Sequence, residues 1–319
     1  MLLSSKLIRH LVVSLITIFS TAIFVSCTDS DSNQDYSYDT STNTLTLSGT
    51  EVPWDEIGAY ASTTEKVVFS DDYNISVIPE KAFFGFSKLA AIDIPDVVTT
   101  IDERAFAKCT SLASVSFPDG LQSIGRAAFG LCESLKSINL PESLQSLGEC
   151  AFCFCYSLYS VTLPEGLEEI GESAFNDCTS LASISLPASL TSIGEQAFNR
   201  CYSLTSVTLP EHLKTIACGA FSDCAFLTTI TLPASLTSIG EWAFESCPSL
   251  KTVEILSNGT PDNKHVIYLG SVDDKTSTGG GSVFPRLQAT LIYDPETTWI
   301  GDDDTQNLRY YFDKFETPE

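Results

Sequence analysis

Residues 105–125 read Ala105-Phe-Ala-Lys-Cys-Thr-Ser-Leu-Ala-Ser-Val-Ser-Phe-Pro-Asp-Gly-Leu-Gln-Ser-Ile-Gly125, and the same order of residue types returns along most of the chain. A periodic Ala-Phe pair begins at 82, 105, 128, 151, 174, 197, 220 and 243, so every interval is 23 residues. A fixed period of this length is typical of a solenoid, in which each repeat packs only on its neighbours. We therefore expect function on a repeated surface.

One period predicts the elements of each rung. Apolar residues from Ala105 to Leu112 lie at spacings that fit one face of a short helix or 3₁₀ turn. Val115 and Phe117 then alternate with serines, which indicates a short strand with one buried face, and Pro118 ends it. Gly125 turns the chain into the next rung.

The pattern Leu-x-x-Val-x-Leu-Pro-x-x-Leu-x-x-Ile-Gly-x-x-Ala-Phe-x-x-Cys resembles the BspA-like class of bacterial leucine-rich repeats, a family of surface and secreted binding proteins. The resemblance covers about 67–295 and implies an α/β leucine-rich-repeat solenoid of 23-residue rungs, capped at both ends. The general leucine-rich consensus has Asn or Cys eight residues after its first Leu. This chain has Gly, Ser, Val or His there, so its asparagine ladder is absent.

The chain divides into six predicted segments. They are a signal peptide (1–26), a disordered acidic tether (27–43), an N-terminal cap of strand, helix and strand (44–70), the solenoid (71–256), a polar insertion (257–281), and an irregular last repeat with a C-terminal cap (282–319).

The N-terminus indicates export. Lys6 and Arg9 precede an apolar stretch of 16 residues, and Cys27 follows Ser26. This is similar to a bacterial lipobox, in which the Cys is lipidated and starts the mature protein. An ordinary cleaved signal and an uncleaved anchor are the alternatives, although the stretch is short for the ~20 residues that span a bilayer. The acidic run after Cys27 resembles the export signal of surface lipoproteins, which implies an outer-membrane protein facing the cell exterior.

The formal charge of −24 makes nucleic acids and anionic lipid surfaces poor partners. Part of this acidity is periodic. One column contains Glu149, Glu172, Glu195 and Glu241, and another contains Glu142, Glu165 and Glu211. Solvated turns and sites for divalent cations are both open interpretations of these columns. The first accounts for them with fewer assumptions, and we predict no metal.

The cysteines look like a disulfide framework, but seven of the eleven recur every 23 residues, from Cys109 to Cys247. Phe86 takes this column in the first rung, which marks it as core, so we predict small buried thiols. A metal site is the alternative interpretation of the run Cys150-Ala-Phe-Cys-Phe-Cys155. Cys150 and Cys218 are three rungs apart, about 15 Å at strand spacing, and should not pair.

No catalytic motif is present. His212 and His265 are the only histidines after the signal, and the chain has no Gly-x-Ser-x-Gly, phosphate loop or His-Glu-x-x-His. We therefore expect no catalytic residues and no cofactor, and a protein that is not an enzyme.

The exposed side of the predicted strands is the candidate binding site. Its outward columns are rich in hydroxyl groups, and three tyrosines lie near their edge. The candidate residues are Ser137, Asn139, Tyr156, Tyr159, Ser160, Thr162, Ser183, Ser185, Tyr202, Ser206 and Thr208. Ser and Thr also simply suit a solvated strand, so a purely structural interpretation stays open.

The resemblance implies a monomeric adhesin that binds a host matrix or plasma protein, or another cell, with the membrane contacted through the lipid anchor only. A structural or glycan-binding component of the cell envelope is the alternative.

Overall fold

The structure is a computed structural model that describes residues 35–255, 266–269, 287–292, 298–300 and 312–316. Residues 1–34, with the predicted signal and Cys27, lie outside the described residues, as do His265 and residues 301–311. The described chain begins with a small sheet of β1 (Tyr36–Asp39), β2 (Thr44–Leu47) and β3 (Lys66–Phe69). Between β2 and β3 lie the helix α2 (Trp54–Ile57) and the 3₁₀ helix η2 (Gly58–Tyr60).

The order strand, helix, strand predicted for 44–70 agrees with β2, α2 and β3. The prediction of disorder over 27–43 is wrong for Tyr36–Asp39, because β1 pairs antiparallel with β2 from Tyr36↔Leu47 to Asp39↔Thr44. Tyr38 of β1 stacks on Tyr60 with ring centroids 4.4 Å apart. This strand therefore belongs to the cap.

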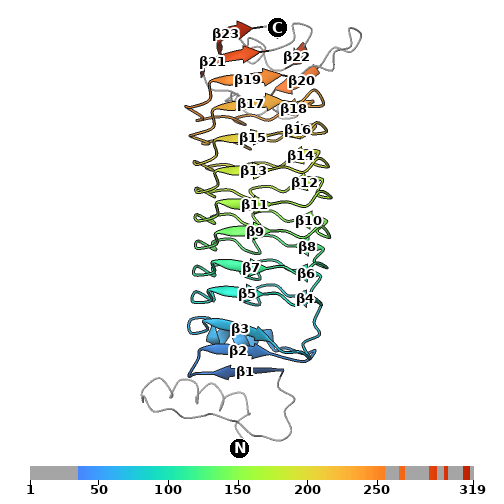
Figure 1. The fold of residues 1–319 in the computed structure, drawn as a ribbon, viewed down its shortest axis with the longest axis vertical. Coiled ribbons are helices and arrows are strands. Elements are labelled where there is room, and N and C mark those ends of the chain that lie inside the picture. The colour runs from blue at the N-terminus through green and yellow to red at the C-terminus, as the bar shows by residue number, and fades with distance from the viewer. Residues whose placement is uncertain (1–34, 256–265, 270–286, 293–297, 301–311, 317–319) are drawn as a thin grey trace, which may run out of the picture. The chain divides into compact units, whose positions relative to one another are not determined.

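From β4 onward the chain climbs in rungs, each with one strand in each of two parallel rows (Figure 1). The first row, which we call the long row, contains β5 (Ala91–Asp93), β7 (Ser114–Ser116), β9 (Ser137–Asn139), β11 (Ser160–Thr162), β13 (Ser183–Ser185), β15 (Ser206–Thr208), β17 (Thr229–Leu232), β19 (Thr252–Ile255), β21 (Leu287–Ile292) and β23 (Phe312–Glu316). The pairing from β9 to β23 is continuous, and β5 and β7 form a separate pair.

The second row, the short row, contains β4 (Val77–Ile78), β6 (Thr100–Ile101), β8 (Ser123–Ile124), β10 (Ser146–Leu147), β12 (Glu169–Ile170), β14 (Ser192–Ile193), β16 (Thr215–Ile216), β18 (Ser238–Ile239), β20 (Val266–Leu269) and β22 (Thr298–Ile300). Register in both rows follows the sequence period, as in Ser160↔Ser137 and Ser192↔Thr215. Every column of the repeat therefore becomes a column in space.

The third side of each rung, which we call the turn side, is the Ala-Phe segment. The sequence predicted a short helix or 3₁₀ turn here, but the segment forms a series of turns. Among the described residues, the only helices are α2 and η2 of the cap. In the rung that begins at Ala105, the N–H groups of Arg104, Phe106 and Lys108 donate to carbonyls of the next rung at 2.7–2.9 Å. Arg104 and Lys108 have φ of 55° and 62°, and both columns keep positive φ in the rungs above.

The physical reason is that a helix would satisfy these N–H groups inside its own rung. In the left-handed conformation alternate N–H groups instead point along the stack, where the next rung supplies the acceptors. A non-Gly residue pays roughly 1–2 kcal/mol for this conformation. The ladder of bonds to the next rung offsets that cost, and such turns are therefore stable only within a stack.

The core between the three sides is apolar and periodic. The phenylalanines of the Ala-Phe pairs form one continuous stack from Phe83 to Phe244, with neighbouring ring centroids 5.0–5.8 Å apart. All eight rings are fully buried. Offset stacked pairs contribute about 0.5–1.5 kcal/mol each beyond their buried area, so this column stabilises each rung against both neighbours.

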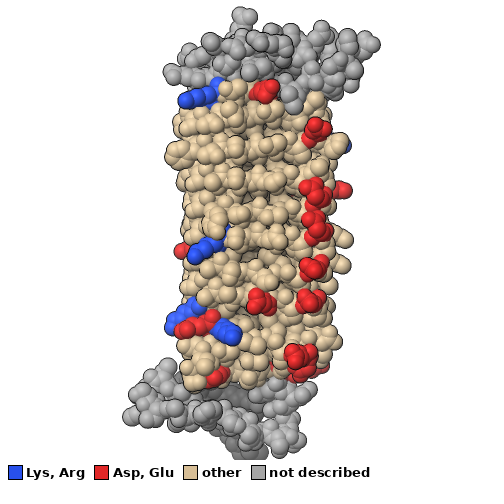
Figure 2. Space-filling view, in the orientation of Figure 1, with Lys and Arg blue, Asp and Glu red and all other residues tan. Residues whose placement is uncertain are grey.

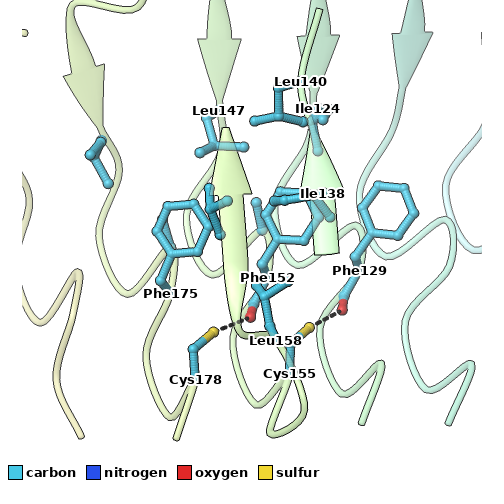
Figure 3. Packing of buried hydrophobic residues seen from close by; sticks show 14 of the residues in the cluster. Ile124, Phe129, Ile138, Leu140, Leu147, Phe152, Cys155, Leu158, Phe175 and Cys178 are labelled. Atoms are coloured by element: carbon cyan, nitrogen blue, oxygen red, sulfur yellow. Dashed lines mark hydrogen bonds between the residues drawn. The ribbon is translucent and has the colours of Figure 1, made fainter. Parts of the chain in front are cut away.

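The seven-cysteine column is confirmed as free, buried thiols. Each thiol donates a hydrogen bond to the carbonyl of a Phe in the preceding rung, at 3.2–3.4 Å. Figure 3 shows this contact for Cys155 with Phe129 and for Cys178 with Phe152. The column therefore fills the core and also adds a thiol hydrogen bond to these buried carbonyls.

The rungs continue past residue 256 with altered spacing. The predicted polar insertion contains β20, which pairs with β18 through Ser238↔Tyr268, so part of it extends the short row. β21 pairs with β19 through Thr252↔Thr290, and β23 pairs with β21. The 23-residue sequence period ends here, although parallel strand pairing continues.

Candidate binding surface

The outward residues of β9, β11, β13 and β15 form one surface, which we call the strand face. It consists of Ser137, Asn139, Ser160, Thr162, Ser183, Ser185, Ser206 and Thr208. All eight are exposed, while the residue between each pair is buried, as predicted from the alternation. Parallel register sets members of a column about 4.8 Å apart, so the face is continuous.

The polar groups of the strand face have no side-chain hydrogen-bond partner within the described part of the chain. Some hydroxyls elsewhere on the rungs are hydrogen-bonded within the protein. For example, Ser143, Ser189 and Ser235 donate to carbonyls of the preceding rung at 2.5–2.7 Å. The strand face leaves its donors and acceptors to solvent or to a partner.

One border of the strand face carries exposed aromatic side chains. The predicted residues Tyr156, Tyr159 and Tyr202 are 39%, 55% and 40% exposed. Phe226 was not among the predicted residues. Its side chain is 60% exposed, and its backbone N–H donates to the carbonyl of Tyr202 at 3.3 Å. The sequence does mark Phe226, because every other rung from Ser111 to Ser249 has Ser in this column. We call these four residues the aromatic border.

The opposite border, where the long-row strands end, is acidic. Figure 2 shows acidic side chains in a line along one side of the uncharged strand face. This column contains Asp96, Asp119, Glu142, Glu165 and Glu211. The Glu142 carboxylate accepts the backbone N–H of Glu165 at 3.1 Å, and Glu165 accepts that of Ala188 at 3.0 Å. These carboxylates therefore close the turns between rungs.

The second acidic column lies on the turn side, where Arg126 contacts Glu149 at 3.0 Å. Across the residues that the structure describes, no group of three or more His, Cys, Asp or Glu side chains is placed to hold a metal ion. Hydrogen bonds from the backbone give Glu142 and Glu165 a structural role that the sequence did not show.

One partly buried carboxyl group lies away from the strand face. Among the described carboxyl groups, only Asp177 has a raised pKa, because burial disfavours its charge while Arg200 at 3.6 Å opposes that effect. Asp177 has positive φ and lies on the turn side. His212 is exposed in a turn. Neither Asp177 nor His212 belongs to the strand face.

Within the described residues no helix is long and apolar enough to cross a membrane.

Two parallel rows of short strands, a 23-residue register and a flat exposed strand face define a leucine-rich-repeat solenoid, a class that typically serves as a binding scaffold. The sequence profile of the BspA type leucine rich repeat region matches residues 59–178 and 147–268, with six copies. The chain belongs to this family. No curated protein matches the chain.

Several solved bacterial structures are similar to the chain. A leucine-rich repeat protein from Bacteroides ovatus is 21% identical, with 94% of this chain and 100% of that chain covered and a TM-score of 0.49. A leucine rich cell surface protein from Faecalibacterium prausnitzii is 23% identical, with coverages of 89% and 93% and a TM-score of 0.39. The pneumococcal vaccine antigen PcpA is 18% identical, with coverages of 81% and 75% and a TM-score of 0.46.

Proposed function

We propose that this protein is a cell-surface adhesin that binds an extracellular protein of a host or of another cell through its strand face. One observation carries the proposal. The strand face presents rows of exposed side-chain hydroxyls without partners among the described residues, whereas the turn hydroxyls of Ser143 and Ser189 are hydrogen-bonded to backbone carbonyls. Polar groups free in the unbound protein bind a partner without first breaking internal bonds.

The aromatic border supplies the second half of the site. Exposed aromatic side chains are the residues that most often dominate binding energy at interfaces. Tyr156 and Tyr202 occupy the same column two rungs apart, or roughly 10 Å at strand spacing. An extended partner would therefore meet aromatic anchors along one border and hydroxyl groups across the face.

The test uses a double variant, Ser160→Arg with Thr208→Arg. Both residues point outward and leave the buried Val161 and Val207 unchanged, so folding should survive at a cost under ~1 kcal/mol. Binding to immobilised matrix and plasma proteins should fall at least about tenfold, because two long cations interrupt the flat face.

The matched control is Gln122→Arg with Gln145→Arg, which adds the same charge at exposed residues beside the short row. It should bind like the unmodified protein. A strand-face variant that keeps native circular dichroism and full affinity would refute the strand face as the binding site.

A neutral polysaccharide is the second candidate partner, within the alternative role of an envelope component. The aromatic border favours it, since aromatic rings beside uncharged hydroxyl groups can bind sugar rings as readily as protein side chains. A glycan array separates the two partners. Saturable glycan binding that Tyr156→Ala and Tyr202→Ala together abolish, with no protein binding, would replace the adhesin proposal.

A lipid anchor at Cys27 is part of the proposed location on the outer membrane. Cys27 is the only Cys beside the apolar N-terminal stretch, so Cys27→Ala should move the protein from the membrane fraction to the soluble fraction. Retention of this variant in membranes after detergent-free fractionation would contradict the lipoprotein proposal.

A further inference from the structure

One rung carries a disulfide on its turn side, between Cys150 and Cys153, with Cα atoms 4.8 Å apart. Neither interpretation of the run Cys150–Cys155, core packing or metal binding, anticipates this bond. The same two columns hold Ala127 with Gly130 in the rung before and Ser173 with Asn176 in the rung after. The pair is therefore an addition to one rung and not part of the repeat.

The backbone of this turn does not need the disulfide. The N–H of Cys153 donates to the carbonyl of Cys150 at 3.1 Å, and the equivalent bond from Gly130 to Ala127 is 3.0 Å without any sulfur. The N–H of Cys150 also donates to the carbonyl of Glu172 in the next rung at 2.7 Å. Hydrogen bonds thus hold both cysteines within bonding range, whether the sulfurs are oxidised or reduced.

The two sulfurs differ in access. Cys150 is partly exposed, whereas Cys153 is only 3% exposed. Cys153 Sγ faces Gly130 of the preceding rung, where an added Cβ would come within 3.4 Å of it. An external thiolate therefore reaches Cys150 first, and Cys153 is placed to leave and to return.

The other thiols are kept out of this chemistry. Cys155 points into the core, donates to the carbonyl of Phe129, and has its pKa raised to about 12 by burial. Cys218, which is partly exposed, stands three rungs away, or about 15 Å at strand spacing. Reduction of the pair therefore leaves no third described thiol in reach, and the bond can open without disulfide shuffling.

We propose that Cys150 and Cys153 form a redox-active pair that exchanges two electrons with external thiols. In the first step a thiolate attacks Sγ of Cys150, the bond between Cys150 and Cys153 breaks, and Cys153 leaves as a thiolate that takes up a proton. A second external thiolate then attacks the external sulfur of the mixed disulfide. This step releases the Cys150 thiol and an external disulfide, and the reverse sequence reoxidises the pair.

The test titrates the folded full chain in cysteine and cystine buffers of graded ratio at neutral pH. Samples are quenched with acid, alkylated and analysed by mass spectrometry. We expect the peptide that contains Cys150 and Cys153 to follow a reversible two-electron curve while the seven core thiols stay unmodified until the protein is denatured. If the pair stays oxidised at every ratio and opens only in denaturant, it is a structural clip and the proposal is overturned.

Two serine variants give an independent readout. Ser173 and Ser222 occupy these columns in other rungs, so Cys150→Ser and Cys153→Ser should both fold. With cystine, Cys153→Ser should form a mixed disulfide at Cys150 at least about tenfold faster than Cys150→Ser forms one at Cys153, because access controls exchange. Equal rates in the two variants would contradict the assigned roles.

Discussion

At the scale of single residues, the cysteine column shows a role that a plain hydrophobe could not fill. Cys132 lies fully buried, packs like a small apolar side chain and gives its S–H to the carbonyl of Phe106 at 3.3 Å. Ala would fill less volume and Val would offer no donor, so the carbonyl would keep only the backbone N–H of Cys109, at 3.2 Å, as its partner. The loss is therefore at most the net value of one hydrogen bond, about 0.5–1.5 kcal/mol, together with the loss of packing.

The buried thiols predict a loss of stability at alkaline pH. Burial raises the pKa of Cys109, Cys155 and Cys247 from 9.0 to about 12. The folded state therefore keeps protons that the unfolded state has lost between about pH 9 and 12, and the free energy of unfolding falls as pH rises through that window. Each thiol contributes at most about 1.4 kcal/mol per pH unit.

Thermal melting of the native protein between pH 8 and 11 checks this expectation. A variant with Cys132→Ala and Cys178→Ala lacks two of the seven column thiols. It should be less stable than the native protein at pH 8 and should lose stability less steeply as the pH rises. An identical slope would show that tyrosines and lysines govern the alkaline transition instead. The same samples, unfolded and alkylated, should show free thiols in the whole column.

At the scale of elements, close backbone approach explains the glycine that precedes five of the eight Ala-Phe turns, at 125, 148, 171, 194 and 240. An added Cβ on Gly148 would lie 2.6 Å from the carbonyl carbon of Gly125 in the rung below. Gly166, in the turn after a long-row strand, has nothing within 4 Å of the same position. Of these two glycines in one repeat, Gly148 has no room for a side chain, whereas Gly166 has open space around it.

Gly148→Ala should destabilise the protein by about 1–3 kcal/mol, the usual cost of forcing extra volume into a packed site. Ala217 occupies this column in one rung, so local rearrangement rather than loss of the fold is expected. Gly166→Ala is the control and should change the free energy of unfolding by under ~0.5 kcal/mol in chemical denaturation. Equal effects would contradict the backbone contact.

The strands could be predicted from the sequence, whereas the conformation of the turn side could not. The strands were predictable because alternation and Pro act within a few residues, as in Ser160–Thr162. The turn side was not, since apolar spacing from Ala105 to Leu112 fits a helix as well as a turn. Acceptors in the neighbouring rung decide between them, and that interaction is not visible in one period. The strand β1 was missed because its partner β2 contributes most of the burial.

At the scale of the whole molecule, the rungs stabilise one another through register. Parallel pairs such as Ile184↔Val207 join identical columns, so each rung contributes an interface to the rungs on both sides. The surface residues of the strand face were predictable from the same period. Phe226 and the Cys150–Cys153 bond were not predicted. These residues differ from their columns in one rung only, and a prediction drawn from the repeat gives no weight to a difference in a single rung.

Removing one rung tests this account. Deletion of residues 183–205 takes out one 23-residue period and joins Ala182 to Ser206, so all columns stay aligned. This variant should keep a native circular dichroism spectrum and cooperative unfolding, with a lower Tm because one interface is lost. It should also bind its partner more weakly, since the strand face is shorter.

A deletion one residue shorter, 183–204, is the control. It inserts Thr205 before the β15 residues, and a one-residue slip turns outward side chains such as Ser206 toward the core and Val207 toward solvent. Burying a hydroxyl without a partner and exposing an apolar side chain in the same strand should cost several times more stability than the in-register deletion. If the two variants melted at the same temperature, the rungs would be held by contacts within each rung, and the stacked register would not be what stabilises the fold.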